Sequence, residues 1–398
     1  GLTVRNDLDF TDLREFAELT FDLTCDGEVL ASGPLPLPGP VPPHATATIP
    51  LPRPVLANLP ASGRCFLTVS YRLARDLPLL AAGHALGFDE VALPTTDPRH
   101  RLSARLLDST GGSGSAPRTQ TTQKAVTVSG DGFVHRFDPR TGLPARMLVD
   151  DVDLLDRPTE INIWRAPTDN DRGAQVDWRR AHYDRAYARA YSCTARTVED
   201  AVVVEAEIAV VAPTVQPILR AGIRWTVRGD GALDLVLSAR RDPEFPALPR
   251  LGLRLFLPQE MNRIRYFGLG PQEAYADKHR ACRHGLFEAD VDELLVDYLR
   301  PQENGSHADC DLVAVTGPRA ELTVAGASPF SFNASRYTQE TLAAARHDIE
   351  LRPCGHTVLC LDAAMAGIGS ASCGPALQER YRVDAELTLH LLLAPSTR

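Results

Sequence analysis

Short runs in which apolar and polar residues alternate cover most of the chain, and turn residues separate them. Such alternation places one set of side chains on each face of a strand, so these runs predict half-buried strands. Three pairs of runs meet at Asp-Gly, namely at Asp26-Gly27, Asp131-Gly132 and Asp230-Gly231. Asp-Gly suits a tight hairpin, because both central residues take a positive φ that Gly adopts freely and Asp tolerates. The pattern predicts an all-β protein built from antiparallel hairpins.

Helical patterns are few. The best covers residues 177–191, "DWRRAHYDRAYARAY", with Asp177 as the expected N-cap. The second lies in residues 335–347, "SRYTQETLAAARH", where Thr338 is the expected cap before Leu342 and Ala345. We therefore expect only brief helices between the strands.

Residues 109–120, "STGGSGSAPRTQ", are small and polar, which is the composition of a linker. This segment predicts one domain over residues 1–108 and a second over residues 121–398. The first has roughly seven short strand patterns and Pro-rich turns, which favour an immunoglobulin-like sandwich. The second is too long for one ordinary sandwich, so we expect a large two-sheet antiparallel domain with long loops.

Composition excludes several classes of function. The net charge is −9 without a basic cluster, so nucleic acid is not an expected partner. An apolar run of about 18 residues is missing, so no membrane-spanning segment is expected. The eight cysteines show no metal-ligand spacing, which favours thiols in a reducing compartment and hence the cytoplasm. The chain starts at Gly1 in what reads as a strand, so we expect it to be a piece of a longer protein.

The stretch "INIWRAPTDNDRG", residues 161–173, brings a tryptophan, an arginine and two carboxylates close together. Three interpretations compete: a calcium loop, a sugar-handling loop, and an Asx-type turn in which Arg165 pairs with one carboxylate. A calcium loop requires a ligand at its fifth position and Glu at its twelfth, where this chain has Gly173 and Arg180. The spacing therefore favours the turn over the metal site.

Three further segments are dense in polar residues: 266–285, 297–310 and 332–347. They either form a sugar-contacting edge or tie loops to the scaffold by buried hydrogen bonds. A nucleophile elbow, a P-loop and a dinucleotide fingerprint are absent from the sequence. Glu273 and Glu303 occur in similar Pro-Gln-Glu motifs, but spacing alone does not identify them as the paired carboxylates of a glycosidase.

Five motifs carry a resemblance to a known family: "INIWRAPTDNDRG", "YFGLGPQEAYADKHRACRHGLF", "YLRPQENGSHADCDLVAV", "FSFNASRYTQETLAAARH" and "LDAAMAGIGS". In order and spacing they resemble the C-terminal domain of glycoside hydrolase family 2 β-galactosidases. The region before the linker resembles the immunoglobulin-like domain that precedes it in those enzymes. The resemblance implies a large antiparallel supersandwich similar to galactose-mutarotase domains. It covers nearly the whole chain.

The resemblance also implies a division of labour. In that family a TIM barrel upstream carries the catalytic glutamates, so this chain is expected to hold no catalytic residue and to be inactive alone. Mg and Na are implied at the barrel, with no cofactor or metal in this chain. The implied partners are a β-galactoside and the barrel domain, and a homo-oligomer stays open.

The resemblance assigns roles within the loop. Trp164 is implied to be a core anchor, and Arg165, Asp169 and Asp171 are implied to fix a loop beside the active-site mouth with Gly173 as a hinge. Relatives carry a sugar-stacking tryptophan about where this chain has Cys373, which puts that subsite in doubt. The implied substrate-side residues are Asp169, Asn170, Asp171, Gly173 and Cys373.

The alternative is a stand-alone sugar-binding or aldose-epimerase-like module. Mutarotation requires a general acid and a general base that converge on the sugar. The nearest candidates in the sequence are His279, His284 and His307 beside Glu273 and Glu303.

Overall fold

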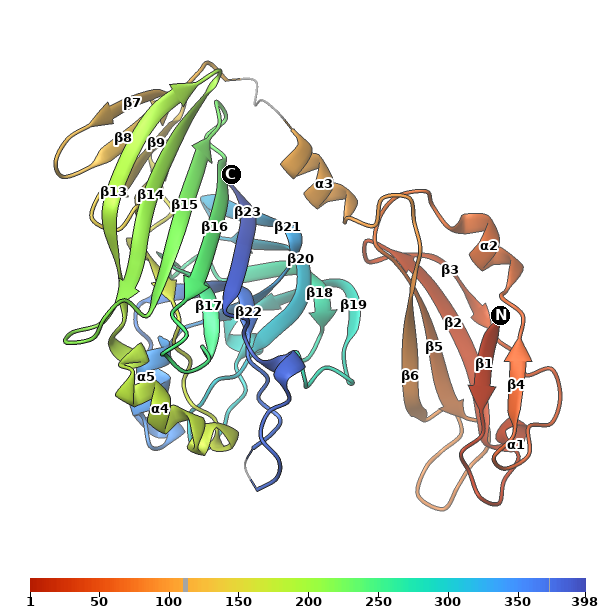
Figure 1. Ribbon diagram of the computed structural model, residues 1–398. Coiled ribbons are helices and arrows are strands. Elements are labelled where there is room, and N and C mark those ends of the chain that lie inside the picture. Colours follow the sequence, from red (N-terminus) through yellow and green to blue (C-terminus); the bar gives the residue numbers. More distant parts are fainter. Residues whose placement is uncertain (110–113, 372) are drawn as a thin grey trace. The chain divides into compact units, whose positions relative to one another are not determined.

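The computed structural model describes residues 1–109, 114–371 and 373–398. The chain divides into two compact units. The first comprises Gly1–Arg101 with His284–Leu286, and the second comprises Leu102–Arg283 with Phe287–Arg398 (Figure 1).

The first unit contains a two-stranded and a four-stranded antiparallel sheet. The small sheet pairs β1 (Leu2–Arg5) with β4 (Thr46–Ile49). The larger has the order β3-β2-β5-β6, formed by Glu28–Pro34, Ala17–Cys25, Cys65–Leu73 and Ala85–Leu93. Two short helices, α1 (Leu13–Phe16) and α2 (Arg53–Asn58), lie between strands. Residues 1–101 therefore form six strands rather than the roughly seven that the sequence predicts.

Every second residue of β2 is buried, which is the predicted alternation. These side chains pack with Ile49 of β4, Val55 of α2 and Leu67 of β5 in one hydrophobic cluster. The two sheets thus enclose a core, as a sandwich requires.

The second unit contains a five-stranded sheet and a twelve-stranded sheet, both antiparallel. The smaller has the order β11-β10-β9-β8-β7, formed by Val152–Asp153, Leu143–Val149, Phe133–Asp138, Val126–Gly130 and Arg118–Thr121. The larger runs β12-β17-β22-β21-β23-β16-β15-β14-β13, with β20, β18 and β19 branching from β21. In the order β12 to β23 its strands are Arg157–Asn162, Tyr187–Val198, Ala201–Val211, Leu219–Val227, Leu233–Arg241, Arg250–Pro258, Arg263–Gly270, Arg283–Asp290, Ser306–Thr316, Ala320–Ser335, His356–Met365 and Glu386–Thr397.

Aromatic side chains join the two sheets of the second unit. Trp225 of β15 is fully buried, donates from its indole N–H to the carbonyl oxygen of Gly142 at 3.1 Å, and lies 5.9 Å from the ring of Phe137 on β9. The all-β, two-sheet prediction for this part is confirmed. Within the described ranges, no helix is long and apolar enough to cross a membrane.

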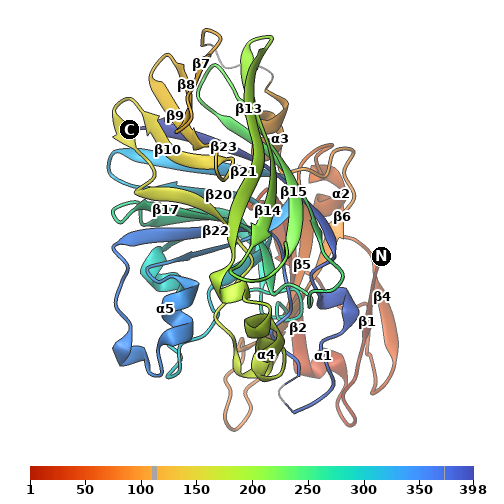
Figure 2. The ribbon, with the colours of Figure 1, turned by 60° about the vertical axis from the view of Figure 1, so that its left-hand side comes forward.

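The helices of this unit are α3 (Arg101–Asp108), α4 (Ala174–Arg180) and α5 (Gln339–Ala344). In both ribbon views α4 and α5 lie at the same end of the large sheet (Figures 1 and 2). The side chain of Thr338 caps α5 as predicted, accepting from the amide of Thr341. The helix predicted over residues 177–191 is wrong beyond Arg180, where α4 ends; a short 3₁₀ turn follows at Tyr183–Arg185, and Tyr187–Val198 pairs along β14 as strand β13. Asp177 lies inside α4 and is not its N-cap.

Two other predictions differ from the structure. Both residues of the Asp26-Gly27 turn have positive φ, at 51° and 85°, whereas at Asp131-Gly132 and Asp230-Gly231 only the glycine does. In the predicted linker 109–120, residues 110–113 lie outside the described residues, and Arg118–Gln120 belong to β7 because they pair with β8.

Candidate functional site

Two loops of the second unit leave the large sheet at the same edge. β12 and β22 both pair antiparallel with β17, one on each side, so β12 and β22 are parallel to each other. Their carboxyl ends therefore meet at the start of β17. The loop that follows β12, residues 163–173, and the loop that follows β22, residues 366–378, are neighbours for this reason.

A buried ion pair fixes the first loop. Arg165 is 1% exposed, and its Nη2 and Nε lie 2.7 and 3.1 Å from the two carboxylate oxygens of Asp171. The same guanidinium donates to the carbonyl oxygens of Ala366 and Gly367. A planar guanidinium can bind a carboxylate with two bonds and still serve other acceptors. Arg165 thereby joins the two loops, as well as pairing with one carboxylate as the Asx-turn interpretation predicts.

Asp171 also organises its own turn. Its Oδ2 accepts hydrogen bonds from the amide of Thr168 at 3.0 Å and from the Thr168 hydroxyl at 3.2 Å, which completes a capping box on the 3₁₀ turn Asp169–Arg172. Asn170 extends from this turn and donates to the carbonyl oxygen of Ile368. Trp164, 2% exposed, packs edge-on against Trp178 at 6.4 Å, which agrees with its predicted role as a core anchor.

A third segment holds the second loop from its other side. Asp277 accepts from the amides of Ile368 at 2.9 Å and Gly369 at 2.8 Å. A Cβ on Gly367 would lie 2.5 Å from the Asp277 carboxyl group, so this approach requires glycine. The "GIG" stretch is therefore held between Asp277 on one side and Arg165 and Asn170 on the other.

The implied substrate-side residues separate into distinct groups. Asp171 is buried and its carboxylate is used in holding the loop. Asp169 is exposed: its amide donates to Gln302 at 3.3 Å, and its carboxylate has no hydrogen bond within the described residues. Gly173 has φ −76° and ψ −53°, which any residue adopts. Cys373 is exposed on the loop that begins at residue 366.

The calcium interpretation fails on the same geometry. Asp171 would be the second carboxylate of such a site, but it faces a guanidinium, and a cation would have to displace Arg165. Among the described residues, no group of three or more His, Cys, Asp or Glu side chains is placed to hold a metal ion.

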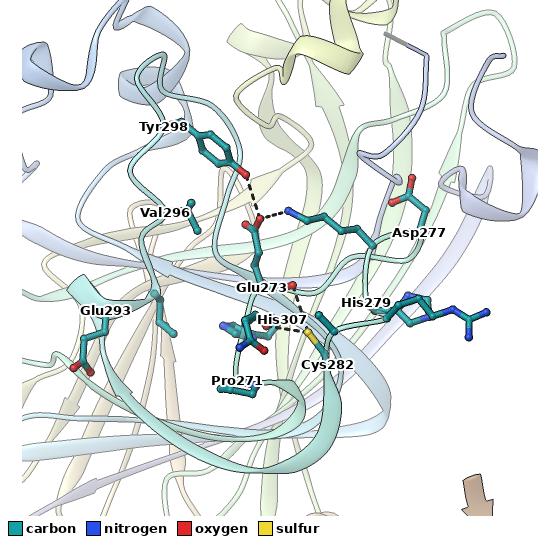
Figure 3. Close-up of a pocket in the computed structure, with 14 residues that line it drawn as sticks. Pro271, Glu273, Asp277, His279, Cys282, Glu293, Val296, Tyr298 and His307 are labelled. Carbon is teal, nitrogen blue, oxygen red and sulfur yellow. Dashed lines mark hydrogen bonds and ion pairs between the residues drawn. The ribbon is translucent and has the colours of Figure 1, made fainter. Parts of the chain in front are cut away.

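A cavity of about 820 Å³ lies beside Asp277 in the second unit. Its lining comes from residues 271–282, from residues 293–298 and from His307 (Figure 3). Glu273 points into the middle of the group, where it accepts from Lys278, from the hydroxyl of Tyr298 at 3.3 Å and from the amide of Gly305 at 2.8 Å. Of the residues proposed for an epimerase-like site, the structure brings Glu273, His279 and His307 to this cavity.

Glu303 is not one of the residues that line the cavity. It is 2% exposed and lies 3.4 Å from Nη1 of Arg250, which forms a two-bond ion pair with Asp362. Its Oε1 is buried with no hydrogen-bond partner among the described residues. Burial raises the pKa of Glu303 to about 7, although Arg250 and Arg165 lower it. This carboxyl group belongs to the buried scaffold beneath the loops.

Sequence reasoning missed Asp277, Arg250 and Asp362. Asp277 lies in the polar segment 266–285 that the sequence singled out, so its density of polar residues was the available signal. Asp362 lies in the motif "LDAAMAGIGS", which carries the family resemblance, whereas for Arg250 a charge at an expected core position of a strand was the available signal.

Comparisons with known proteins identify the family. The description "Beta-galactosidase, domain 4" matches residues 2–94, and "Beta galactosidase small chain" matches residues 129–393. The chain belongs to the β-galactosidase family, and its resemblance to the C-terminal portion of a glycoside hydrolase family 2 β-galactosidase is confirmed. It is 35% identical over 388 residues to the β-galactosidase of Actinobacillus pleuropneumoniae, covering 96% of this chain and 36% of that protein.

The β-galactosidase of Staphylococcus xylosus is 34% identical over 264 residues, covering 66% of this chain and 27% of that protein. The chain thus spans about a third of the length of these relatives. Among solved structures, the galactose 1-epimerase of Lactobacillus acidophilus NCFM aligns with a TM-score of 0.36 and 8% identity, covering 71% of this chain and 98% of that one. At this level of likeness, the epimerase activity is not carried over to this chain.

Proposed function

We propose that this chain is the non-catalytic C-terminal portion of a larger retaining β-galactosidase, which hydrolyses terminal β-D-galactosides. The observation that carries the proposal is the docking of residues 366–369 between Arg165, Asn170 and Asp277, which fixes the base of the loop that bears the exposed Cys373. In this proposal the loop forms one wall of the galactoside pocket.

The state of the two candidate glutamates supports a non-catalytic role. A retaining glycosidase requires two carboxyl groups that reach opposite sides of one glycosidic bond. Glu273 is held by three donors, and Glu303 is buried beside Arg250. In the proposal, the catalytic glutamates, the Mg and the Na belong to a barrel domain outside this chain. The barrel domain and a β-galactoside are its partners, and the cytoplasm is its compartment.

Steady-state kinetics test both parts. The chain alone should not hydrolyse o-nitrophenyl β-D-galactoside above the buffer rate. Turnover by the chain that disappears in Glu273→Gln would overturn the non-catalytic assignment.

In the complete enzyme, Cys373→Trp should lower KM, because an indole provides an apolar platform that a thiol lacks. A stacking contact is worth about 0.5–1.5 kcal/mol, or about two- to tenfold in KM. Cys373→Ser, which has nearly the same size as the wild-type residue, should leave KM unchanged. A Trp variant with the wild-type KM would place Cys373 away from the sugar.

A further inference from the structure

The cavity beside Asp277 has a size and a lining that the function above does not use. Its volume of about 820 Å³ lies within the range of about 300–1,000 Å³ that is usual for small-molecule sites. In the view of Figure 3, Val296 and Glu293 lie on one side, and Glu273, Cys282 and His307 lie on the other. Polar groups therefore lie on both sides of this cavity, and Glu273, Cys282 and His307 share one wall.

His307 contributes one defined edge to that wall. It is 1% exposed, and its ring packs against Tyr266 and Phe332, whose centroids are 4.5 and 5.2 Å away and lie 5.0 Å from each other. Its Nδ1 lies 3.2 Å from the carbonyl oxygen of Leu269 and therefore carries the proton. Because Nδ1 is bound, Nε2 is the polar atom that His307 can offer to the cavity it lines. Nε2 has no hydrogen-bond partner in the described part of the chain.

This imidazole is an acceptor at neutral pH. Burial lowers the pKa of His307 to about 4, so the ring is uncharged at pH 7. A neutral imidazole that donates through Nδ1 must accept through Nε2. Its natural ligand group is therefore a hydrogen-bond donor such as a hydroxyl.

Each of the three carboxylates that line the cavity already has a donor, and Glu293 accepts from the amide of Asp290 at 2.7 Å. The lining cation Arg280 is exposed. The Glu273 carboxylate faces the Lys278 ammonium, and Asp277 is occupied by two backbone amides. An ionic ligand would leave one of these charges without its partner in a partly buried site, which is costly. The arrangement therefore favours an uncharged ligand with several hydroxyl groups.

Part of the remaining lining is apolar. It includes Pro271, Ala281, Leu294 and Val296. A pyranose sugar has both features that this lining matches, namely hydroxyls around its edge and a C–H face. We propose that the cavity binds a neutral pyranose, with His307 Nε2 accepting from one hydroxyl and the Glu273–Lys278 pair contacting others. The proposal goes beyond the function above, because it requires only this chain.

The two lysines of the chain offer a direct test. Lys278 lines the cavity, whereas Lys124 lies exposed in the turn before β8, so Lys124 is an internal control. The chain is acylated with an N-hydroxysuccinimide ester with and without D-galactose, and peptide mass spectrometry gives the rate at each lysine. Galactose at about ten times its Kd should slow Lys278 about tenfold, because only the unliganded fraction reacts. The rate at Lys124 should not change.

Variants test whether the protection of Lys278 arises from galactose bound in the cavity. His307→Phe keeps the ring stack but removes the acceptor, so the galactose concentration that gives half protection should rise about tenfold. Val296→Trp should block the cavity from its rim, and it changes a partly exposed position, so it tests the proposal even if His307→Phe does not fold. Cys373→Ala should keep full protection.

Three results would overturn the proposal: equal rates at Lys278 with and without galactose, protection that survives Val296→Trp, or protection that Cys373→Ala abolishes. Protection by galacturonate but not by galactose would also overturn it, since the ligand would then be an anion. None of these results bears on the KM of the complete enzyme, so the two proposals fail separately.

Discussion

Replacing Glu303 with Gln should stabilise the chain at alkaline pH. Arg165 is paired with Asp171 and Arg250 with Asp362, so this buried group is neutral before Glu303 is counted. An ionised Glu303 adds one uncompensated negative charge with only a 3.4 Å contact to Arg250. The variant carries an uncharged group of the same shape.

The magnitude follows from the pKa. Burial raises the pKa of Glu303 from its ordinary 4.5 to about 7, so the folded state favours the protonated form. The stability that this preference contributes is full below pH 4.5 and is lost as pH rises through 7. At 1.36 kcal/mol per pKa unit, the folded state loses about 3 kcal/mol relative to a chain with Gln at this position.

The assay is urea unfolding at two pH values. The difference in unfolding free energy between Glu303→Gln and wild type should be about 3 kcal/mol larger at pH 8.5 than at pH 4. Any change in unfolding free energy that comes from the hydrogen bonds of the introduced glutamine amide is the same at both pH values, so it cancels when the two are compared. Asp362→Asn is the matched contrast: it strips Arg250 of its main partner and should destabilise the chain by about 3–5 kcal/mol. A Glu303→Gln effect that does not change with pH would refute the reasoning.

Two further predictions concern the loop and the core. Asp171→Ala should lower the free energy of unfolding by about 3–5 kcal/mol because it leaves Arg165 buried without its partner, whereas Asp169→Ala should change it by less than about 0.5 kcal/mol. Equal shifts of the melting temperature in the two variants would contradict this distinction. Burial lowers the pKa of His135 to about 4, so the stability contributed by its neutral form is full above pH 6.5 and is lost as pH falls through 4. The unfolding free energy of wild type should therefore fall about 3 kcal/mol more than that of His135→Gln between pH 6.5 and 4, and an equal fall in both would contradict the prediction.

Local patterns predicted those features of the fold whose determinants are close in sequence. The alternation in β2, the Asp26-Gly27 turn and the Thr338 cap each depend on a few adjacent residues. The pairing of Arg165 with Asp171 was also open to prediction, because six positions separate them. The helix predicted over residues 177–191 failed beyond Arg180, and from Tyr187 onward pairing with β14 outweighs the helix propensity of alanine and arginine.

The rest of the site depends on contacts between distant segments. Asp277 holds an amide 91 positions away, and Arg250 pairs with a carboxylate 112 positions away. A single sequence carries no sign of such pairing. The sequence marked residues 266–285 as rich in polar groups, but only the fold shows that Asp277 in that segment supports the loop near Cys373 while Glu273 and Lys278 balance each other in the cavity.

The central claim is that the loop bearing Cys373 lies against the galactoside in the complete β-galactosidase. Cys373 is the exposed cysteine, while the other seven are buried or half-buried, so brief alkylation in the native state should mark it first. The direct measurement is the rate of Cys373 alkylation by N-ethylmaleimide in the complete enzyme, with and without a non-hydrolysable thiogalactoside. The account predicts that a saturating thiogalactoside slows alkylation at Cys373 and leaves the slower cysteines unchanged. An unchanged rate at Cys373, with the ligand shown to inhibit turnover in the same sample, would contradict it.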